Sequence, residues 1–92
     1  MLKITHSNRF KKDFRRLARS GRFDLKLFNS VVNQLASNLE LAKKYEDHAL
    51  QGELKKFREC HLAPDLLLIY SKDMEVLTLF LFRIGNHSEL FR

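Results

Sequence analysis

The chain has 92 residues, 45% of them hydrophobic, with three glycines and one proline; this excludes a disordered chain and leaves room for only one hydrophobic core. Its single cysteine excludes an internal disulfide framework and is typical of a reducing cytoplasm. The net charge of +6 favours a polyanionic partner, such as nucleic acid, a ribonucleoprotein or an acidic protein segment.

The ends and the apolar runs of the chain argue against secretion and against a membrane span. MLKITHSNRF carries charges where a signal peptide has its apolar region. The runs LLLIY and VLTLFLF fall short of the roughly 20 residues that a membrane helix needs. We therefore expect a single domain over residues 1–92, located in the cytoplasm and without membrane contact.

The N-terminal third predicts a short edge strand over residues 1–5 and then a helix. Ser7 or Asn8 can cap this helix, because a short side-chain oxygen accepts a hydrogen bond from the first turn. Phe10, Phe14 and Leu17 recur at helical spacing, and the Ser20–Gly21 pair ends the helix.

The same helix carries seven bases and a single acid, Asp13, between residues 9 and 22. At helical spacing the bases point away from the apolar stripe. A solvated face usually mixes both signs, whereas a face of one sign repels itself, so we predict a phosphate-binding surface. The bases are Arg9, Lys11, Lys12, Arg15, Arg16, Arg19 and Arg22, and we expect Lys12, Arg16 and Arg19 to bind substrate.

The remainder predicts a second helix and then a sheet. Asp24 can cap a helix that continues to about Leu39, and residues 40–52 form a loop containing His48. A polar strand spans 54–62, and two apolar strands, 65–70 and 75–84, are joined by a turn. The fold class is α+β: a short N-terminal strand, a two-helix antiparallel hairpin, and a mainly antiparallel twisted sheet of about four strands, with the apolar pair central.

The strand ends bring polar residues together. In a hairpin that turns near residues 72–74, the start of the first strand lies beside the end of the second. We therefore expect Asp65 and Arg83 to be neighbours, with His61 and His87 just beyond them. Arg83 continues the apolar face of Leu77, Leu79 and Leu81, which is costly unless it meets an anion. That anion is either Asp65 or the phosphate of a ligand.

Several histidines, a carboxylate and an arginine beside a basic helix suit RNA cleavage without a metal. The 2′-OH attacks the adjacent phosphate, histidines act as base and acid, and arginine stabilises the charge of the transition state. A histidine metal site is disfavoured because no close histidine pair exists and Arg83 would repel a cation. A Cys60–His61 nucleophile is disfavoured because adjacent strand residues point to opposite faces. We expect no cofactor.

The runs YEDHALQGELKKFRECHLAPDLLLIY and LFRIGNHSELF resemble the RelE/ParE toxin superfamily of bacterial toxin–antitoxin pairs, and within it the YafQ-type mRNA interferases. The resemblance covers essentially the whole chain. It implies a ribosome-dependent endoribonuclease that cleaves mRNA in the ribosomal A site and inhibits translation. It also implies a cognate antitoxin, with the toxin a monomer alone and a hetero-oligomer with that partner.

Carried over position by position, the resemblance implies that His48, His61, Asp65, Arg83, His87 and Phe91 form the site. We expect His48 to act as the general base, His87 to act as the general acid and Arg83 to bind the phosphate. The general base and the general acid could be exchanged. His61 and Asp65 would orient those groups, and Phe91 would stack on a base. Leu66 stands where the family often has an aromatic residue, so no ring is available there. Lys55, Lys56 and Arg58 complete the expected substrate contacts, and the basic helix would contact rRNA.

Two other functions stay open from the sequence. A ParE-like toxin would inhibit gyrase with the same fold, but it would not need three histidines. A non-enzymatic module binding RNA or the ribosome would need only the basic helix. Since neither helices nor strands show an aromatic-rich surface for bases, we also expect feeble cleavage of free RNA.

Overall fold

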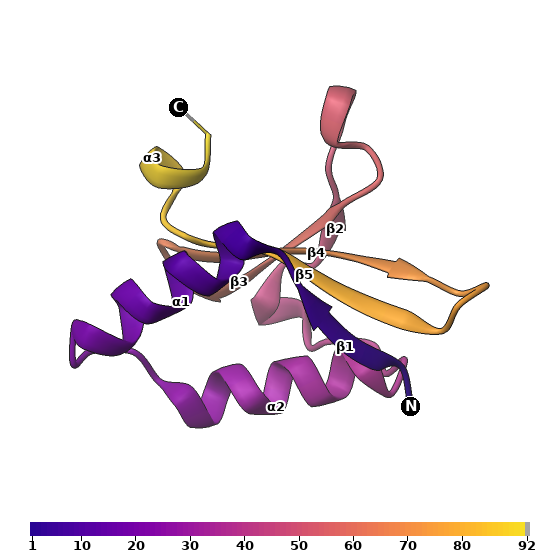
Figure 1. The fold of residues 1–92 in the computed structure, drawn as a ribbon, viewed down its shortest axis with the longest axis horizontal. Helices are drawn as coiled ribbons and strands as arrows, with labels where there is room; N and C mark the ends of the chain where they lie inside the picture. The colour runs from indigo at the N-terminus through magenta and orange to yellow at the C-terminus, as the bar shows by residue number, and fades with distance from the viewer. Residues whose placement is uncertain (92) are drawn as a thin grey trace.

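The structure is a computed structural model that describes residues 1–91; Arg92, the last residue of the expected domain, lies outside them. Figure 1 shows a twisted sheet with two long helices on one side and a short C-terminal helix on the other. The elements are β1 (Lys3–His6), α1 (Asn8–Arg19), α2 (Leu25–Ala36), η1 (Lys43–Tyr45), β2 (His48–Ala49), η2 (Gly52–Leu54), β3 (Arg58–Ala63), β4 (Leu66–Asp73), β5 (Thr78–Gly85) and α3 (His87–Leu90).

The five strands are arranged in the order β1-β5-β4-β3-β2. The apolar strands β4 and β5 are central, as predicted, and β1 closes one edge by pairing in parallel with β5. The predicted α+β class is confirmed, with one strand more than expected. The extra strand, β2, pairs His48 with Glu59 inside the segment predicted to be a loop. Two residues are too few to show a strand periodicity.

The turn between β4 and β5 falls later than the sequence suggested. Asp73 Oδ1 accepts hydrogen bonds from the backbone N–H groups of Glu75 and Val76, and Leu77 adopts a left-handed φ of 51°. Residues 75–77 are therefore a turn, and β5 begins only at Thr78.

A bulge in β5 changes which residues face the helices. Ile69 of β4 pairs with Arg83, but Tyr70 pairs with Leu81, so Phe82 is an extra residue on β5. A bulge breaks the two-residue alternation of a strand. Ile84 therefore continues the buried face of Leu79 and Leu81, and the expectation that Arg83 would do so was wrong.

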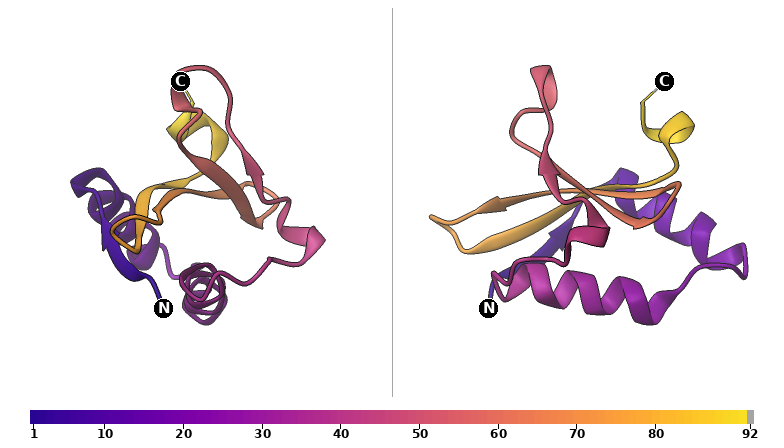
Figure 2. Two further views of the ribbon diagram at one scale, coloured as in Figure 1. Left: turned by 90° about the vertical axis from the view of Figure 1, so that its right-hand side faces the viewer. Right: turned by 180° about the vertical axis from the view of Figure 1, so that it is seen from behind.

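The helical layer packs through phenylalanine rings. Phe28 of α2 lies 5.2 Å from Phe14 and 6.1 Å from Phe10, measured between ring centroids. Phe23, in the connection between the helices, meets Phe14 edge-on at 5.3 Å. Buried α2 residues such as Val31 and Leu35 complete the core. Figure 2 shows α1 and α2 covering the same face of the sheet.

Among residues 1–91, no helix is long and apolar enough to cross a membrane.

Ser7 joins the first helix to the sheet, and its loss should be measurable. Its Oγ accepts the N–H of Phe10 at 2.9 Å, as a helix cap, and donates to the Phe82 carbonyl at 2.6 Å. We predict that Ser7→Ala lowers the free energy of unfolding, measured by urea denaturation, by about 1–2 kcal/mol. Ser30→Ala is the matched control, because the exposed Ser30 side chain accepts a hydrogen bond from Gln34 and has no other within residues 1–91. Equal effects of the two variants would contradict the role given to Ser7.

Candidate active site

Three histidines from three elements stand in a row. His48 lies on β2, His61 on β3 and His87 at the start of α3. The ring centroids of His48 and His61 are 6.2 Å apart, and those of His61 and His87 are 6.0 Å apart. The structure thus brings together the three histidines that the sequence singled out. The fourth, His6, is on β1 and contacts Phe10.

Two glutamates that the sequence analysis missed hold the first two rings. The Oε2 atom of Glu59 lies 2.9 Å from His48 Nε2 and 3.8 Å from His61 Nε2. Glu46 Oε2 lies 3.4 Å from His61 Nδ1. Glu59 is only 6% exposed, so this carboxylate is buried against the histidines. Glu59 and His61 are two residues apart and therefore lie on one face of β3. This spacing was the sequence feature that could have indicated Glu59.

His48 is held through both ring nitrogens. Its Nδ1 lies 2.6 Å from the Glu46 carbonyl oxygen, while Nε2 faces Glu59. A carbonyl and a carboxylate only accept hydrogen bonds, so the doubly protonated ring alone can donate to both. Both surroundings of His48 therefore accept hydrogen bonds from its ring.

Within residues 1–91, His87 is held through one ring nitrogen. Its Nδ1 lies 3.1 Å from Asp65 Oδ1, which also accepts the backbone N–H of His87 at 3.3 Å. These hydrogen bonds lower the pKa of Asp65 below its ordinary value. An Nδ1–H that donates to a carboxylate leaves Nε2 as the nitrogen with an open lone pair.

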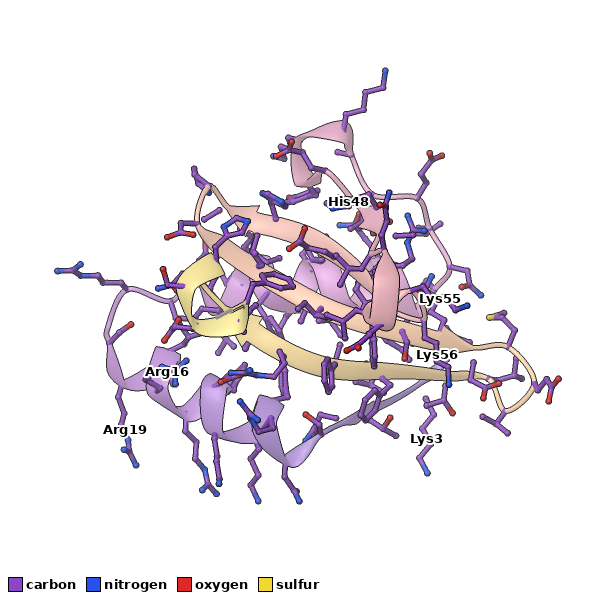
Figure 3. The ribbon with its side chains drawn as sticks, turned by 90° about the horizontal axis from the view of Figure 1, so that it is seen from above. Lys3, Arg16, Arg19, His48, Lys55 and Lys56 are labelled. Carbon is purple, nitrogen blue, oxygen red and sulfur yellow. The ribbon has the colours of Figure 1, made fainter. Side chains whose placement is uncertain are left out.

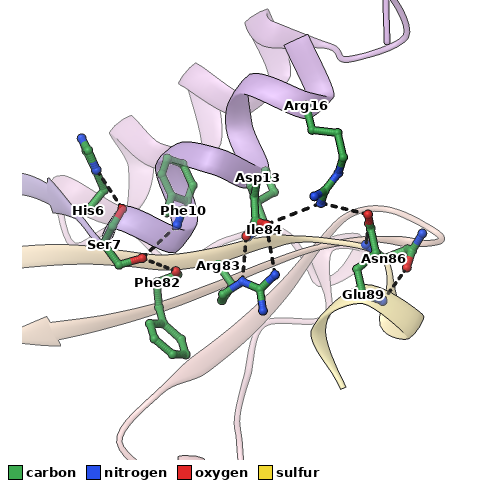
Figure 4. Close-up of polar contacts among 10 residues, drawn as sticks. All are labelled: His6, Ser7, Phe10, Asp13, Arg16, Phe82, Arg83, Ile84, Asn86 and Glu89. Atoms are coloured by element: carbon green, nitrogen blue, oxygen red, sulfur yellow. Dashed lines mark hydrogen bonds and ion pairs between the residues drawn. The ribbon is translucent and has the colours of Figure 1, made fainter. Parts of the chain in front are cut away.

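Arg83 does not meet Asp65, so that expectation was wrong; it meets Asp13 of α1 (Figure 4). Its Nε and Nη2 donate to the two carboxylate oxygens at 2.8 and 3.0 Å, and the Ile84 N–H adds a third bond at 3.2 Å. The reason is local. β1 stops pairing with β5 at Leu81, so α1 rather than a strand lies along the rest of that edge.

Asp13 is buried, although its helix is otherwise basic on its exposed side. Burial opposes its ionisation, but the hydrogen bonds from Arg83 and from the Ile84 N–H outweigh this effect. The pKa of Asp13 is therefore lowered below its ordinary value of 3.8. Arg16 also approaches it, at 3.5 Å, and reaches Glu89 of α3 at 2.8 Å.

The expected substrate-binding bases fall into separate groups. Figure 3 shows Lys55 and Lys56 far from Arg16 and Arg19 of α1. Lys12 is exposed on the same helix. Arg58 joins neither group: its Nε lies 3.3 Å from Asp47, and as the neighbour of Glu59 on β3 it points to the other face.

The aromatic residues differ partly from expectation. Phe91 is 41% exposed and its ring lies 6.2 Å from that of His87. The sheet also carries a phenylalanine group that the sequence analysis denied: Phe57 stacks on Phe82 at 4.4 Å, with Phe80 at 6.3 Å from Phe82. Since Phe80 and Phe82 alternate with buried Leu79 and Leu81, this group lies on the face away from α1 and α2.

Two other chemistries find no support in the geometry. Cys60 is fully buried, and burial raises the pKa of its thiol to about 12, so it is not a nucleophile. Residues 1–91 contain no group of three or more His, Cys, Asp or Glu side chains arranged to hold a metal ion.

The sequence matches one protein family over nearly its whole length. The profile of the family described as "Bacterial toxin of type II toxin-antitoxin system, YafQ" matches residues 2–92. The chain belongs to this family. The mRNA interferase toxin YafQ of Escherichia coli K12 is 35% identical over 89 residues, covering 96% of this chain and 94% of that protein.

Solved structures agree with this assignment. A metal-bound toxin from Helicobacter pylori superposes with a TM-score of 0.93 at 56% identity, covering 99% of this chain and 100% of that one. The E. coli DinJ–YafQ complex gives 0.85 at 33% identity, with both chains covered completely. The fold predicted from the sequence is therefore that of YafQ toxins.

We predict that Asp13→Asn lowers the free energy of unfolding at pH 7 by about 3 kcal/mol, because it leaves Arg83, whose side chain is only 13% exposed, without its counter-charge. Asp24→Asn is the control, since Asn caps a helix as well as Asp does and Asp24 only accepts the Leu27 N–H.

The same variant should show a pH signature. Because the pKa of Asp13 is lowered in the folded state, its contribution is complete above 3.8 and is lost as the pH falls through the lowered value. The difference in stability between wild type and Asp13→Asn should therefore shrink at acid pH. A difference that stays constant down to pH 2 would contradict the assigned ionisation.

Proposed function

We propose that this chain is the toxin of a type II toxin–antitoxin pair and a metal-independent endoribonuclease that cleaves mRNA in the ribosomal A site, in the cytoplasm. The observation that carries the proposal is the row of three imidazoles, each in contact with a carboxylate. The name of the E. coli relative, mRNA interferase toxin, supports the reaction class. Cleavage uses the 2′-OH of the RNA, so DNA would be inert.

His87 is the better general base. Asp65 holds its Nδ1, which leaves Nε2 open to take the proton of the 2′-OH. A carboxylate that orients a histidine in this way also stabilises the imidazolium that forms. This reverses the assignment first expected from the sequence.

His48 is then the general acid. Its two nitrogens face the Glu46 carbonyl and the Glu59 carboxylate, both of which accept hydrogen bonds from a ring N–H, the group that an acid needs. A small displacement from Glu59 would bring the Nε2 proton to the departing 5′-oxygen. His61, between the other two rings and also beside Glu59, lies where its ring can donate a hydrogen bond to the reacting phosphate.

The remaining expected residues keep binding roles in the proposal. Arg83 uses Nε and Nη2 on Asp13, so its Nη1 remains available to an RNA phosphate. Phe91, exposed beside His87, stacks on a base. Lys55, Lys56 and Arg16 contact the mRNA, while Lys12 and Arg19 contact rRNA on the ribosome. Arg58 stabilises the fold through its ion pair with Asp47 and does not contact the substrate.

The partner is a small antitoxin protein, as DinJ is for E. coli YafQ. It neutralises the toxin by covering or distorting the row of histidines. Alone the toxin is a monomer, and with the antitoxin it forms a hetero-oligomer.

We predict that expression of the wild-type chain arrests bacterial growth and leaves cleaved transcripts, whereas His48→Ala and His87→Ala do neither. General acid or base catalysis contributes about 100-fold or more, so each loss should be large. His6→Ala is the control, because His6 lies on β1, apart from the row. Arrest with intact transcripts would instead indicate gyrase inhibition or simple ribosome binding.

The acid and the base can be separated with a modified substrate. An RNA in which sulfur replaces the 5′-bridging oxygen has a leaving group that needs no acid. On this RNA, in purified ribosome complexes, we expect His48→Ala to recover most of its activity and His87→Ala to remain inactive. Recovery of His87→Ala alone would show that the two roles are exchanged.

We predict that exhaustive dialysis of the purified toxin against EDTA leaves its cleavage rate unchanged, because the proposed steps use only imidazole and carboxylate groups. The H. pylori relative described as metal-bound makes this a necessary test. A loss of cleavage that added Zn²⁺ or Cu²⁺ restores would refute metal independence.

A further inference from the structure

The side of α3 away from the histidines carries a second polar site. A hollow of about 380 Å³ lies between α1, the end of β5 and α3, and it is lined by Arg9, Arg16, Arg83, Glu89 and Leu90. Three guanidinium groups from two elements thus converge on one depression. No histidine lines it, and Arg83 is the residue that it shares with the proposed site.

Two carboxylates shape this hollow without neutralising it. Asp13 fixes Arg83 through Nε and Nη2 and approaches Arg16. Glu89 binds Arg16 Nη2 at 2.8 Å. Arg9 is exposed and forms no ion pair with any residue in 1–91. Three positive charges therefore face two negative ones, and the Nη1 atom of Arg83 and the whole guanidinium of Arg9 remain available.

Glu89 also has a second attachment that limits its movement. Its Oε1 accepts the Asn86 N–H at 3.0 Å, while Asn86 accepts the Glu89 N–H at 2.9 Å, a reciprocal cap of α3 (Figure 4). The carboxylate is thereby held at the arginines by its own helix. Its Oε2 atom occupies a position at Arg16 that a phosphate oxygen could take.

We propose that this hollow is a phosphate subsite for the RNA backbone next to the cleaved bond, and that Glu89 occupies it in the free protein. Guanidinium forks suit phosphate because they donate to two oxygens at once. The proposal rests on the proposed function, since it places the same RNA strand across α3, with the reacting phosphate at the histidines and its neighbour at Arg9, Arg16 and Arg83.

The test is binding of a short RNA whose 2′-OH groups are all methylated, so that it cannot be cleaved. We expect Arg9→Gln to weaken binding several-fold and to reduce the slope of log affinity against log salt by about 0.7, the share of one phosphate contact on a single strand. Glu89→Gln should strengthen binding several-fold, because glutamine keeps the acceptor for the Asn86 N–H and loses the competing charge. Lys26→Gln, an exposed charge on α2, is the control and should leave binding close to wild type.

The outcomes separate the subsite from the reaction. If Arg9→Gln behaves like Lys26→Gln, or Glu89→Gln does not bind more tightly, the subsite is wrong even where the wild type cleaves RNA. Titration with inorganic phosphate, followed by NMR at the Arg Nε–H groups, should perturb Arg9 and Arg83 even if no cleavage is found. If Arg9→Gln weakens antitoxin binding and leaves RNA binding unchanged, the hollow is an antitoxin contact and the proposal is overturned.

Discussion

The arrangement of the site depends on one buried ion pair, between Asp13 of α1 and Arg83 of β5. A carboxylate taken out of water is costly unless hydrogen bonds and a counter-charge replace its hydration. Here two guanidinium N–H groups and one backbone N–H do so. The third bond uses the N–H of Ile84, which has no partner in β1 at that point. The pair therefore fixes α1 against the unpaired end of β5 as well as fixing the guanidinium.

The orientation of α3 is set by contacts on both of its sides. A helix of four residues has too little internal hydrogen bonding to persist alone. Its order must come from Asn86, from the contact of His87 with Asp65 and from the contact of Glu89 with Arg16. Gly85 leaves room for the Glu89 side chain, because a Cβ there would lie 2.9 Å from Oε1, the oxygen that accepts the Asn86 N–H. The helix that carries His87 is thus held from both sides.

The sequence was informative where local periodicity decides the structure. The apolar spacing of α1, α2, β4 and β5 predicted the elements and their central or outer place. One assumption about the hairpin turn was enough to bring His61, Asp65 and His87 together. The bulge at Phe82 has no such local signature, because it arises from the pairing of two strands. Without it the partner of Arg83 could not be derived, and Asp13 remained an isolated acid on a basic helix.

Glu59 was missed for a different reason: a glutamate in a polar strand normally faces water, and only the β2–β3 pairing shows that His48 covers it. The acids held in ion pairs and the exposed bases of α1 therefore have different tasks in this chain. Asp13, Glu46, Glu59, Asp65 and Glu89 are each engaged with a histidine or an arginine inside the sites. Few acids remain to neutralise the bases of α1, which keeps the field of that helix attractive to polyanions. The ion pairs within the sites set the orientation of the reacting groups. The exposed bases of α1 set only the strength of attraction to a polyanion, and that attraction weakens with salt.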